Sequence, residues 1–342
     1  MEAIILSGGF GTRLRPLTYT RAKSLLPILN KPMISHIIDL LPDCVDKVIL
    51  AVNYKKEQIE DYFKENDHGK KIIVNDEPKP LGTGGAIKFA EKHIKDRFLV
   101  LNSDVICSLN LDEMISFHER NNAVTTISLW PVENVSEFGV VDVNKQGHIT
   151  GFVEKPKPED APSNLINAGA YCLEKTVFDY IPTGRLVSME KEIFPKIIKD
   201  TNRFYGYEFK GYWMDIGRIS SYLYVNKFLL DKKKKENCIA DNLQLKGKIH
   251  KTSIGKNVSI GKNTKLESCI IYDNAEINDN ATIFNSVIGE KSIIQDNSEL
   301  KDVVIGDEEI IVKNSKIENK TIWNKPVPEG YPKKQIGNAI KK

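Results

Sequence analysis

In the first 230 residues, short apolar runs alternate with stretches whose apolar residues recur every three or four positions. The apolar runs have the length and aliphatic content of strands, and they lie at Ala3–Leu6, Lys47–Val52, Lys71–Val74 and Phe98–Leu101. The stretches between them predict helices near Met33–Leu41, Glu57–Lys64 and Gly85–His93. This alternation is typical of a mostly parallel sheet covered by helices.

After about Val124 the helical stretches become rarer, and further strands are expected. The candidates are Thr125–Trp130, Gly139–Val143 and His148–Val153. Closely spaced strands favour some antiparallel pairing. We therefore expect residues 1–230 to form one α/β domain with a Rossmann-like, mixed but mostly parallel sheet.

A second pattern begins near Ile254, where aliphatic residues recur about every six positions with small slips. The positions are Ile254, Ile260, Leu266, Ile271, Ile277, Ile283, Ile288, Ile294, Leu300 and Ile305. A hexapeptide repeat predicts a parallel β-helix, because each short strand turns after six residues and points one aliphatic side chain inward. We expect this β-helix to span residues 246–325 and to have about four three-sided coils.

Two connecting segments remain. The charged run from Asp231 to Asn237 follows the apolar residues Phe228–Leu230 and predicts a helix end that leads into a linker over 231–245. The run of lysines is either a solvated helix end or a basic binding patch. Residues 326–342 are expected to form a C-terminal tail.

The composition of the chain argues against several classes of protein. Lys and Arg exceed Asp and Glu by three, so no overall charge favours nucleic acid or an anionic membrane. No apolar stretch approaches the length of a membrane span, and the N-terminal apolar run is short for a signal peptide, so we expect a cytoplasmic protein. The five cysteines contain no C-x-x-C pair and the six histidines do not cluster, which argues against zinc chemistry and Ser/His catalysis.

A glycine-rich stretch follows the first strand and runs from Gly8 to Thr18. Glycines there let the backbone turn its N–H groups toward phosphate oxygens, and Arg13 adds a charged bidentate donor. Lys23 lies ten residues further on and could meet the same anion. The stretch is neither a P-loop nor a dinucleotide fingerprint. A tight structural turn and a solvated lysine are the alternatives.

Two carboxylates are candidate ligands for Mg²⁺. Asp104 follows the apolar strand Phe98–Leu101, and polar residues at the carboxyl ends of parallel strands are placed to meet ligands. Asp215 stands among the bulky residues Trp213, Met214 and Ile216, where a carboxylate is costly unless paired or metal-bound. Mg²⁺ takes few protein ligands besides phosphate oxygens and waters. Each aspartate could instead cap a turn.

Three further segments could bind hydroxyl or phosphate groups. Glu154 and Lys155 follow a strand and precede Pro156, so they could bind a sugar hydroxyl and a phosphate or form a surface ion pair. The segments Leu81–Ala86 and Asn167–Gly169 could approach a nucleoside or a hydroxyl, or could be turns.

Together these segments resemble the nucleotide-sugar pyrophosphorylase family. Residues Gly8–Pro27 are similar to its long signature G-G-x-G-T-R-L-x-P-L-T-x-x-x-P-K-x-L-x-P, except that Ala22 stands where the family usually has proline. The segments around Asp104, Glu154, Asn167, Glu190 and Asp215 look most like the GDP-mannose pyrophosphorylase branch, which also has a C-terminal left-handed parallel β-helix.

The resemblance implies roles for particular residues. Arg13, Lys23, Asp104 and Asp215 would be catalytic, with Asp104 and Asp215 binding Mg²⁺. The nucleotide would be bound by Leu6, Gly8, Gly9, Gly11, Thr12, Arg13, Gly82, Gly84, Gly85 and Asp104. The sugar 1-phosphate would be bound by Gly139, Glu154, Lys155, Asn167 and Gly169.

The resemblance also implies the reaction, which is Mg²⁺-dependent transfer of a nucleotidyl group from a nucleoside triphosphate to a sugar 1-phosphate, with release of pyrophosphate. The phosphate of the sugar is already anionic, so alignment and charge neutralisation are needed rather than a general base. GTP with mannose 1-phosphate is the first expectation, and dTTP or UTP with glucose 1-phosphate is the alternative. The β-helix implies a homo-oligomer.

Two other function classes were weighed. A regulatory subunit that binds a nucleotide sugar without catalysis has no chemical reason to keep Arg13, Lys23, Asp104, Lys155 and Asp215 together. A second, acyl-transfer activity in the β-helix normally needs a base such as histidine, and residues 254–323 contain none.

Overall fold

The computed structural model describes residues 1–332, and the predicted tail therefore lies partly outside the described residues. The chain divides into two compact units. The first comprises residues 1–9 and 34–213, and the second comprises residues 10–33 and the chain from Met214 onward. The predicted boundary at residue 230 differs from this division, because residues 10–33 group with the C-terminal part of the chain. Among the described residues, no helix is long and apolar enough to cross a membrane.

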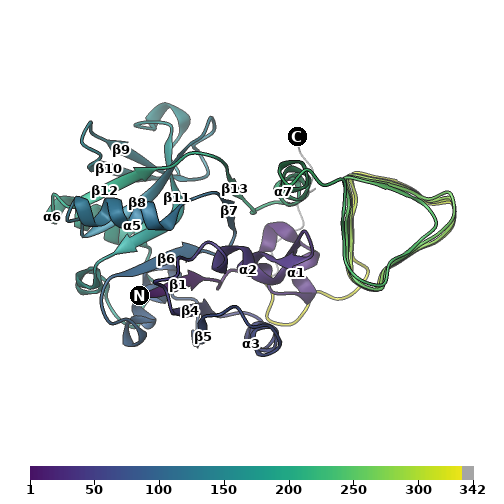
Figure 1. The fold of residues 1–342 in the computed structure, drawn as a ribbon, viewed down its shortest axis with the longest axis horizontal. Helices are drawn as coiled ribbons and strands as arrows, with labels where there is room; N and C mark the ends of the chain where they lie inside the picture. Colours follow the sequence, from purple (N-terminus) through teal and green to yellow (C-terminus); the bar gives the residue numbers. More distant parts are fainter. Residues whose placement is uncertain (333–342) are drawn as a thin grey trace. The chain divides into compact units, whose positions relative to one another are not determined.

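The first unit contains a mixed sheet, as predicted, and this sheet has nine strands, in which β10-β9-β11-β6-β1-β4-β5 lie side by side and β8 pairs with β11 and β12 (Figure 1). Its strands are β1 (Glu2–Leu6), β4 (Lys47–Val52), β5 (Lys71–Asp76), β6 (Phe98–Asn102), β8 (Thr125–Pro131), β9 (Gly139–Val143), β10 (Ile149–Glu154), β11 (Leu165–Leu173) and β12 (Phe204–Glu208). Its α-helices are α2 (Met33–Ile38), α3 (Lys56–Glu65), α4 (Gly82–Phe89), α5 (Leu111–Arg120) and α6 (Phe194–Asp200).

Strands β4, β1 and β6 are parallel to one another, and β11 joins β6 in the antiparallel direction. The predicted strands Lys47–Val52 and Gly139–Val143 have the observed bounds, and the other predicted strands differ by one or two residues at their ends. The apolar side chains that the pattern assigned to these strands form one buried core, which includes Ile4, Ile49 and Val100. The hydrophobic pattern therefore predicted seven of the nine strands, and it missed β11 and β12.

In the second unit, residues 10–33 form short elements: η1 (Thr12–Leu14), α1 (Leu17–Thr20), η2 (Lys23–Leu25), β2 (Pro27–Ile28) and β3 (Lys31–Pro32). Strand β13 (Trp213–Asp215) leads into the unit and is followed by α7 (Ile219–Lys232). The run of lysines after Asp231 stands at the end of α7, as predicted, and its side chains are exposed.

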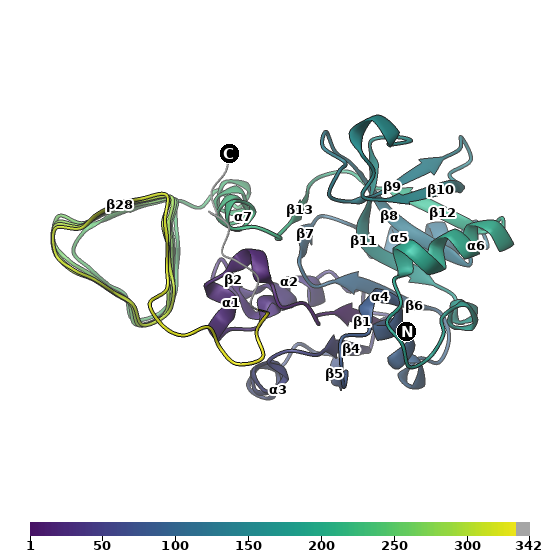
Figure 2. The ribbon, with the colours of Figure 1, turned by 180° about the vertical axis from the view of Figure 1, so that it is seen from behind.

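The rest of the second unit is a parallel β-helix whose coils appear as stacked triangles (Figure 1, and Figure 2 from behind). One sheet holds β14 (Cys238–Ile239), β17 (Ser253–Ile254), β20 (Ile270–Ile271), β23 (Val287–Ile288), β26 (Val304–Ile305) and β29 (Thr321–Ile322). The second holds β15 (Gln244–Leu245), β18 (Ser259–Ile260), β21 (Glu276–Ile277), β24 (Ile293–Ile294) and β27 (Ile310–Ile311). The third holds β16 (Lys248–His250), β19 (Lys265–Glu267), β22 (Thr282–Phe284), β25 (Glu299–Lys301) and β28 (Lys316–Glu318).

The structure agrees with the predicted left-handed β-helix but corrects its repeat and its start. Equivalent residues such as Asn257 and Asn274 are 17 positions apart, because two six-residue steps and one five-residue step make each coil. This explains the slips in the hexapeptide pattern. Strands β14 and β15 already pair with the next coil, so the first coil lies in the predicted linker.

Candidate functional site

The candidate site of the first unit is a cavity of about 360 Å³ at the carboxyl ends of β1, β4 and β6. These strands end level with one another, since Leu6 lies opposite both Ala51 and Asn102. The cavity is lined by Leu6, Gly8, Gly9, Ala51, Asn53, Glu77, Pro80, Gly82, Thr83, Ala86, Asn102 and Asp104. Ligands of open α/β sheets bind at this edge.

Five residues predicted to bind the nucleotide line this cavity: Leu6, Gly8, Gly9, Gly82 and Asp104. A side chain at Gly8 would approach Asn53 Nδ2 to 3.1 Å, whereas a Cβ at Gly9 would meet no atom within 4 Å. The Gly9 backbone therefore lies open on one side, as a phosphate-binding turn requires.

Asn53, Glu77 and Asn102 line the cavity but were not among the predicted site residues. Asn53 follows β4, Glu77 follows β5 and Asn102 ends β6, so each lies at the carboxyl end of a predicted strand. The rule that led to Asp104 would have found all three. Their meeting depends on strand order, which the local pattern does not give.

Gly84 and Gly85, also predicted to approach the nucleoside, do not line the cavity. Their N–H groups donate to the carbonyl of Val187 at 2.9 and 3.3 Å. A Cβ at Gly84 would lie 2.9 Å from Val187 Cγ1, and one at Gly85 would lie 2.9 Å from the carbonyl oxygen of Arg185. Close packing of α4 against residues 185–187 accounts for these two glycines.

Two polar groups stand out in the cavity wall. Glu77 is only 6% exposed, and burial raises the pKa of its carboxyl to about 7, although the N–H of Leu81 donates to it at 3.3 Å. The Oδ1 atom of Asn53 is buried and has no hydrogen-bond partner among the described residues. Buried polar atoms usually have partners, so these groups are suited to a polar ligand.

The predicted sugar-phosphate residues gather next to this cavity. Gly169 adopts φ +84°, and a Cβ there would lie 2.6 Å from Nδ2 of the cavity residue Asn102. The N–H of Gly169 donates to Asn167 Oδ1 at 3.0 Å, and Asn167 Nδ2 donates to the hydroxyl of Tyr171 at 2.9 Å. Asn167 is therefore held in place by its neighbours rather than being a free turn residue.

Glu154 lies at the end of β10, where a Cβ at Gly139 would approach its Oε2 to 3.0 Å. Burial and the nearby charge of Glu190 raise the pKa of Glu154. Glu190, which the sequence analysis left without a role, also accepts hydrogen bonds from Ser188 and from the cavity residue Thr83, at 2.6 and 2.7 Å. Lys155 is exposed, with its Nζ 3.6 Å from Glu154 Oε1.

The remaining predicted residues lie in the second unit. Gly11 adopts φ +64°, and a Cβ there would meet Thr18 Cγ2 at 2.8 Å and Lys23 Cβ at 3.1 Å. A Cβ at Gly217 would lie 2.8 Å from Arg13 Nη2 and 2.5 Å from Asp215 Oδ2. The structure thus brings Arg13 and Asp215 together, and it folds Lys23 back against Gly11. Thr12 begins η1 between them.

The predicted metal ligands Asp104 and Asp215 are divided between the two units. Each is partly buried, and each offers carboxylate oxygens, the ligand type that Mg²⁺ prefers. Among residues 1–332, no group of three or more histidine, cysteine or acidic side chains could hold a metal. Carboxylate oxygens of this kind suit a hard cation that is also held by phosphate oxygens.

Comparisons with known proteins show the family to which the chain belongs. Residues 2–232 match the family described as Nucleotidyl transferase, and residues 242–337 match the family described as GMPPB C-terminal domain. The chain belongs to the nucleotidyl transferase family. The match over residues 2–232 covers the glycine-rich stretch from Gly8 to Thr18 and the sheet with its cavity.

Relatives of this nucleotidyl transferase carry different names. It is 42% identical to "Bifunctional protein GlmU" of Methanococcus maripaludis over 68% of this chain and 55% of that protein. It is 44% identical to "Mannose-1-phosphate guanyltransferase" of Yarrowia lipolytica over 65% of this chain and 62% of that protein. It is 40% identical to "Probable mannose-1-phosphate guanylyltransferase 2" of Arabidopsis thaliana, with 77% and 76% covered. The matched part thus spans less than two thirds of the first two relatives.

Solved structures show the same fold for about two thirds of the chain. HddC from Yersinia pseudotuberculosis complexed with GMP-PN has a TM-score of 0.57 and 32% identity, and the match covers 67% of this chain and 99% of HddC. A UDP-glucose pyrophosphorylase complexed with UDP-glucose has a TM-score of 0.61 and 26% identity, with 68% and 98% covered.

Proposed function

We propose that this protein transfers a guanylyl group from GTP to mannose 1-phosphate, with Mg²⁺, and so forms GDP-mannose and pyrophosphate. The observation that carries the proposal is the cavity at the sheet edge, whose wall contains both the Gly8-Gly9 turn and Asp104. Through Asn102 this cavity adjoins the cluster of Gly169, Asn167 and Tyr171. A nucleotide bound in the cavity would therefore lie beside a second polar site, where the sugar 1-phosphate could bind.

The proposed reaction needs alignment more than proton transfer. A phosphate oxygen of mannose 1-phosphate attacks the α-phosphorus of GTP. The bond from that phosphorus to the oxygen between the α- and β-phosphates breaks, and this oxygen leaves as a terminal oxygen of pyrophosphate. The attacking oxygen is anionic at neutral pH, so no side chain has to remove a proton. Arg13, Lys23 and Lys155 would neutralise the phosphates, and the glycine backbone would orient them. Mg²⁺, when bound by Asp104 and Asp215, would neutralise further phosphate charge.

The cavity wall offers a basis for choosing guanine. The guanine edge presents two adjacent donors, N1–H and the N2 amino group, and an ionised Glu77 could accept from both. A thymine or uracil ring presents one N–H between two carbonyl oxygens, so one oxygen of the same carboxylate would face a carbonyl. Since burial penalises the charged form of Glu77, two hydrogen bonds from guanine would favour ionisation when the nucleotide binds.

The names of relatives and of one solved structure support GTP and mannose 1-phosphate as the substrates. Relatives from Yarrowia lipolytica, Arabidopsis thaliana and Candida glabrata are named as mannose-1-phosphate guanyl- or guanylyltransferases, at 40 to 44% identity. HddC, in a complex with GMP-PN, supports a guanine nucleotide. Cytoplasmic residence and assembly into a homo-oligomer are further parts of the proposal, consistent with the enzyme class.

The test is release of pyrophosphate in the presence of Mg²⁺, with GTP, dTTP, UTP, ATP and CTP each paired with mannose, glucose and N-acetylglucosamine 1-phosphates. We expect release with GTP and mannose 1-phosphate to exceed that with every other pair. Preferential release with dTTP or UTP and glucose 1-phosphate would support the alternative substrates and overturn the guanine assignment. No release with any pair from folded protein would contradict the enzyme and favour a regulatory subunit.

A further inference from the structure

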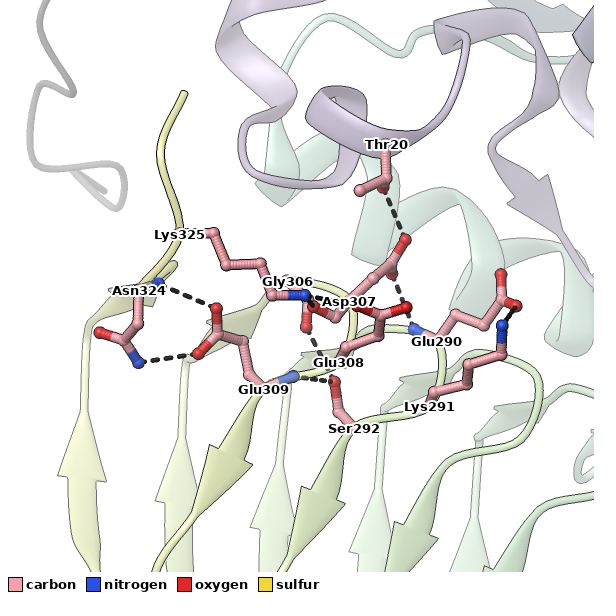
Figure 3. A network of polar contacts seen from close by, with 10 residues as sticks. All are labelled: Thr20, Glu290, Lys291, Ser292, Gly306, Asp307, Glu308, Glu309, Asn324 and Lys325. Atoms are coloured by element: carbon pink, nitrogen blue, oxygen red, sulfur yellow. Dashed lines mark hydrogen bonds and ion pairs between the residues drawn. The ribbon is translucent and has the colours of Figure 1, made fainter. Parts of the chain in front are cut away.

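Residues 323–332, which we call the strap, return from the last coil of the β-helix to the phosphate-binding segment 10–33 of the same unit. The strap is fastened at its start. Asn324 donates to Glu309 from its backbone N and from Nδ2, at 2.8 and 2.7 Å, and Lys325 Nζ contacts the Asp307 carbonyl at 2.9 Å and Glu308 Oε2 at 2.8 Å (Figure 3). The strap is thus held by the last coil of the β-helix.

At the other end of the strap, Tyr331 is 3% exposed and contacts the phosphate-binding segment through its hydroxyl. That oxygen lies 2.9 Å from the Phe10 carbonyl and 2.8 Å from Thr18 Oγ1, and Thr18 Oγ1 lies 3.0 Å from the Gly11 carbonyl. Each hydroxyl has one hydrogen, so the chain of bonds ends on one of the two carbonyls. In either arrangement, the Tyr331 hydroxyl ties the strap to the turn that precedes Arg13.

Aromatic packing fixes the same contact. The Tyr331 ring meets Tyr19 edge to face with ring centres 4.9 Å apart, and Phe10 with centres 5.8 Å apart. The Arg15 guanidinium lies 4.8 Å from the centre of the Tyr331 ring. Such contacts each add to the stability of a buried cluster.

A corner of the β-helix holds the far end of α1. Thr20 Oγ1 donates to Asp307 Oδ2 at 2.6 Å, and the other oxygen of Asp307 accepts the N–H of Glu290 at 2.7 Å (Figure 3). The next residue, Arg21, donates to Glu290 Oε2 at 2.7 Å and lies over the ring of Tyr272 at 4.7 Å. The segment that carries Arg13 and Lys23 is therefore fixed at both ends of α1 by β-helix and strap residues.

We infer that Tyr331 is a positioning residue for nucleotide binding, which it supports by holding Phe10, Gly11 and Thr18 so that Arg13 and Lys23 meet the triphosphate. The inference rests on the proposed function, in which these two cations bind the triphosphate. Pre-ordering of the turn by the strap lowers the entropy lost when the nucleotide binds. The β-helix and the strap then contribute to substrate binding through their contacts with residues 10–33.

The test compares Tyr331→Phe, which removes only the hydroxyl, with Tyr331→Ala. Tyr224→Phe serves as the matched control, because Tyr224 is 58% exposed on α7 and belongs to neither the turn nor the strap. We expect Tyr331→Phe to raise the KM for GTP about fivefold and Tyr331→Ala to raise it more than about tenfold. The KM for mannose 1-phosphate should change less than about twofold, and Tyr224→Phe should match the wild type.

Calorimetric titration with a non-hydrolysable GTP analogue measures the same effect without turnover. Adding Thr18→Val to Tyr331→Phe should weaken binding by less than the product of the separate effects, because both hydroxyls act through one contact. Equal nucleotide affinity in the wild type and Tyr331→Phe overturns the inference, as does an equal rise of both KM values. A wild type that binds the analogue but releases no pyrophosphate refutes the proposed function, while the titration still decides the role of Tyr331.

Discussion

Individual glycines mark the places where the backbone of the candidate site admits no side chain. Gly169 combines φ +84° with a prospective Cβ contact of 2.6 Å to Asn102 Nδ2, so both its conformation and its surroundings exclude larger residues. The sequence showed this glycine beside Asn167 but could not distinguish a turn from a binding segment. Its contact with Asn102, 67 positions earlier, exists only in the folded sheet.

Gly169→Ala should therefore weaken both folding and sugar-phosphate binding. Gly184 is the matched control, because it also has a positive φ, +74°, but its Cβ would meet no atom within 4 Å. We expect Gly184→Ala to cost about 1 kcal/mol and Gly169→Ala about 3 kcal/mol of unfolding free energy. Only Gly169→Ala should raise the KM for the sugar 1-phosphate. Equal thermal shifts for the two variants would show that the Asn102 contact is unimportant.

Glu77 should make the stability of the protein depend on pH. Its carboxyl has a pKa of about 7 against an ordinary value of 4.5, so the folded chain binds this proton more tightly than the unfolded chain. Its contribution to stability is full below about pH 4.5 and is lost as the pH rises through about 7. Glu77→Gln should become more stable relative to the wild type as the pH is raised, by up to about 3 kcal/mol.

Thermal unfolding midpoints of the wild type and Glu77→Gln, measured between about pH 5 and pH 8, test this expectation. The exposed residue Glu65 supplies the control variant Glu65→Gln. A difference between the wild type and Glu77→Gln that stays constant with pH would show that Glu77 does not titrate in this range.

Among the structural elements, the β-helix was predicted correctly as a type of fold, but its repeat length and its first residue were not. Its aliphatic positions, such as Ile271 and Ile288, line the buried interior as expected. The five-residue third step was missed, although it recurs regularly in the sequence, from Leu266 to Ile271, from Ile283 to Ile288 and from Leu300 to Ile305. The frequent asparagines have a cause that the composition alone did not give: Asn257, Asn263 and Asn280 occupy corners with positive φ.

Asn280 illustrates how a corner is stabilised. It has φ 59°, it accepts a hydrogen bond from Asn263, and its Nδ2 donates to Asn297 Oδ1 at 3.2 Å. Asn280→Ala should lose the side-chain bonds and strain the backbone, at a cost of about 2 kcal/mol. Asn280→Gly removes the same bonds but accepts the positive φ. The midpoint of thermal unfolding should be highest for the wild type and lowest for Asn280→Ala. A midpoint for Asn280→Gly below that of Asn280→Ala would show that the positive φ does not cause the loss of stability.

For the whole chain, the sequence predicted the elements that have a local pattern of residues. It did not predict contacts between segments that lie far apart in the sequence. The phosphate-binding stretch, the sheet and the β-helix all have local patterns. The strap has none: its key residue, Tyr331, lies in the predicted tail and contacts Phe10 and Thr18, more than 300 positions away. Likewise, Asn53 and Glu77 meet in one cavity wall because β1, β4 and β5 are neighbours in the sheet.

The proposed chemistry predicts a distinctive pH dependence for the whole enzyme. If the attacking phosphate oxygen needs no general base, kcat should be flat between about pH 7 and pH 9, since the second phosphate pKa is near 6. In contrast, kcat/KM for GTP should show an inflection near 7 from Glu77, whose raised pKa belongs to the free protein. Glu77→Gln should remove that inflection without changing the flat kcat.

Initial rates at saturating concentrations of both substrates, and at limiting GTP, separate these two profiles. Chelation of divalent ions by EDTA should abolish turnover at every pH, and added Mg²⁺ should restore it, because the phosphates would otherwise repel each other. A bell-shaped kcat profile would require an acid and a base in the bound complex. Among the described residues that line the candidate nucleotide site, Glu77 is the only carboxyl whose pKa is strongly shifted. A bell-shaped profile would therefore refute the proposal that catalysis rests on alignment and charge neutralisation.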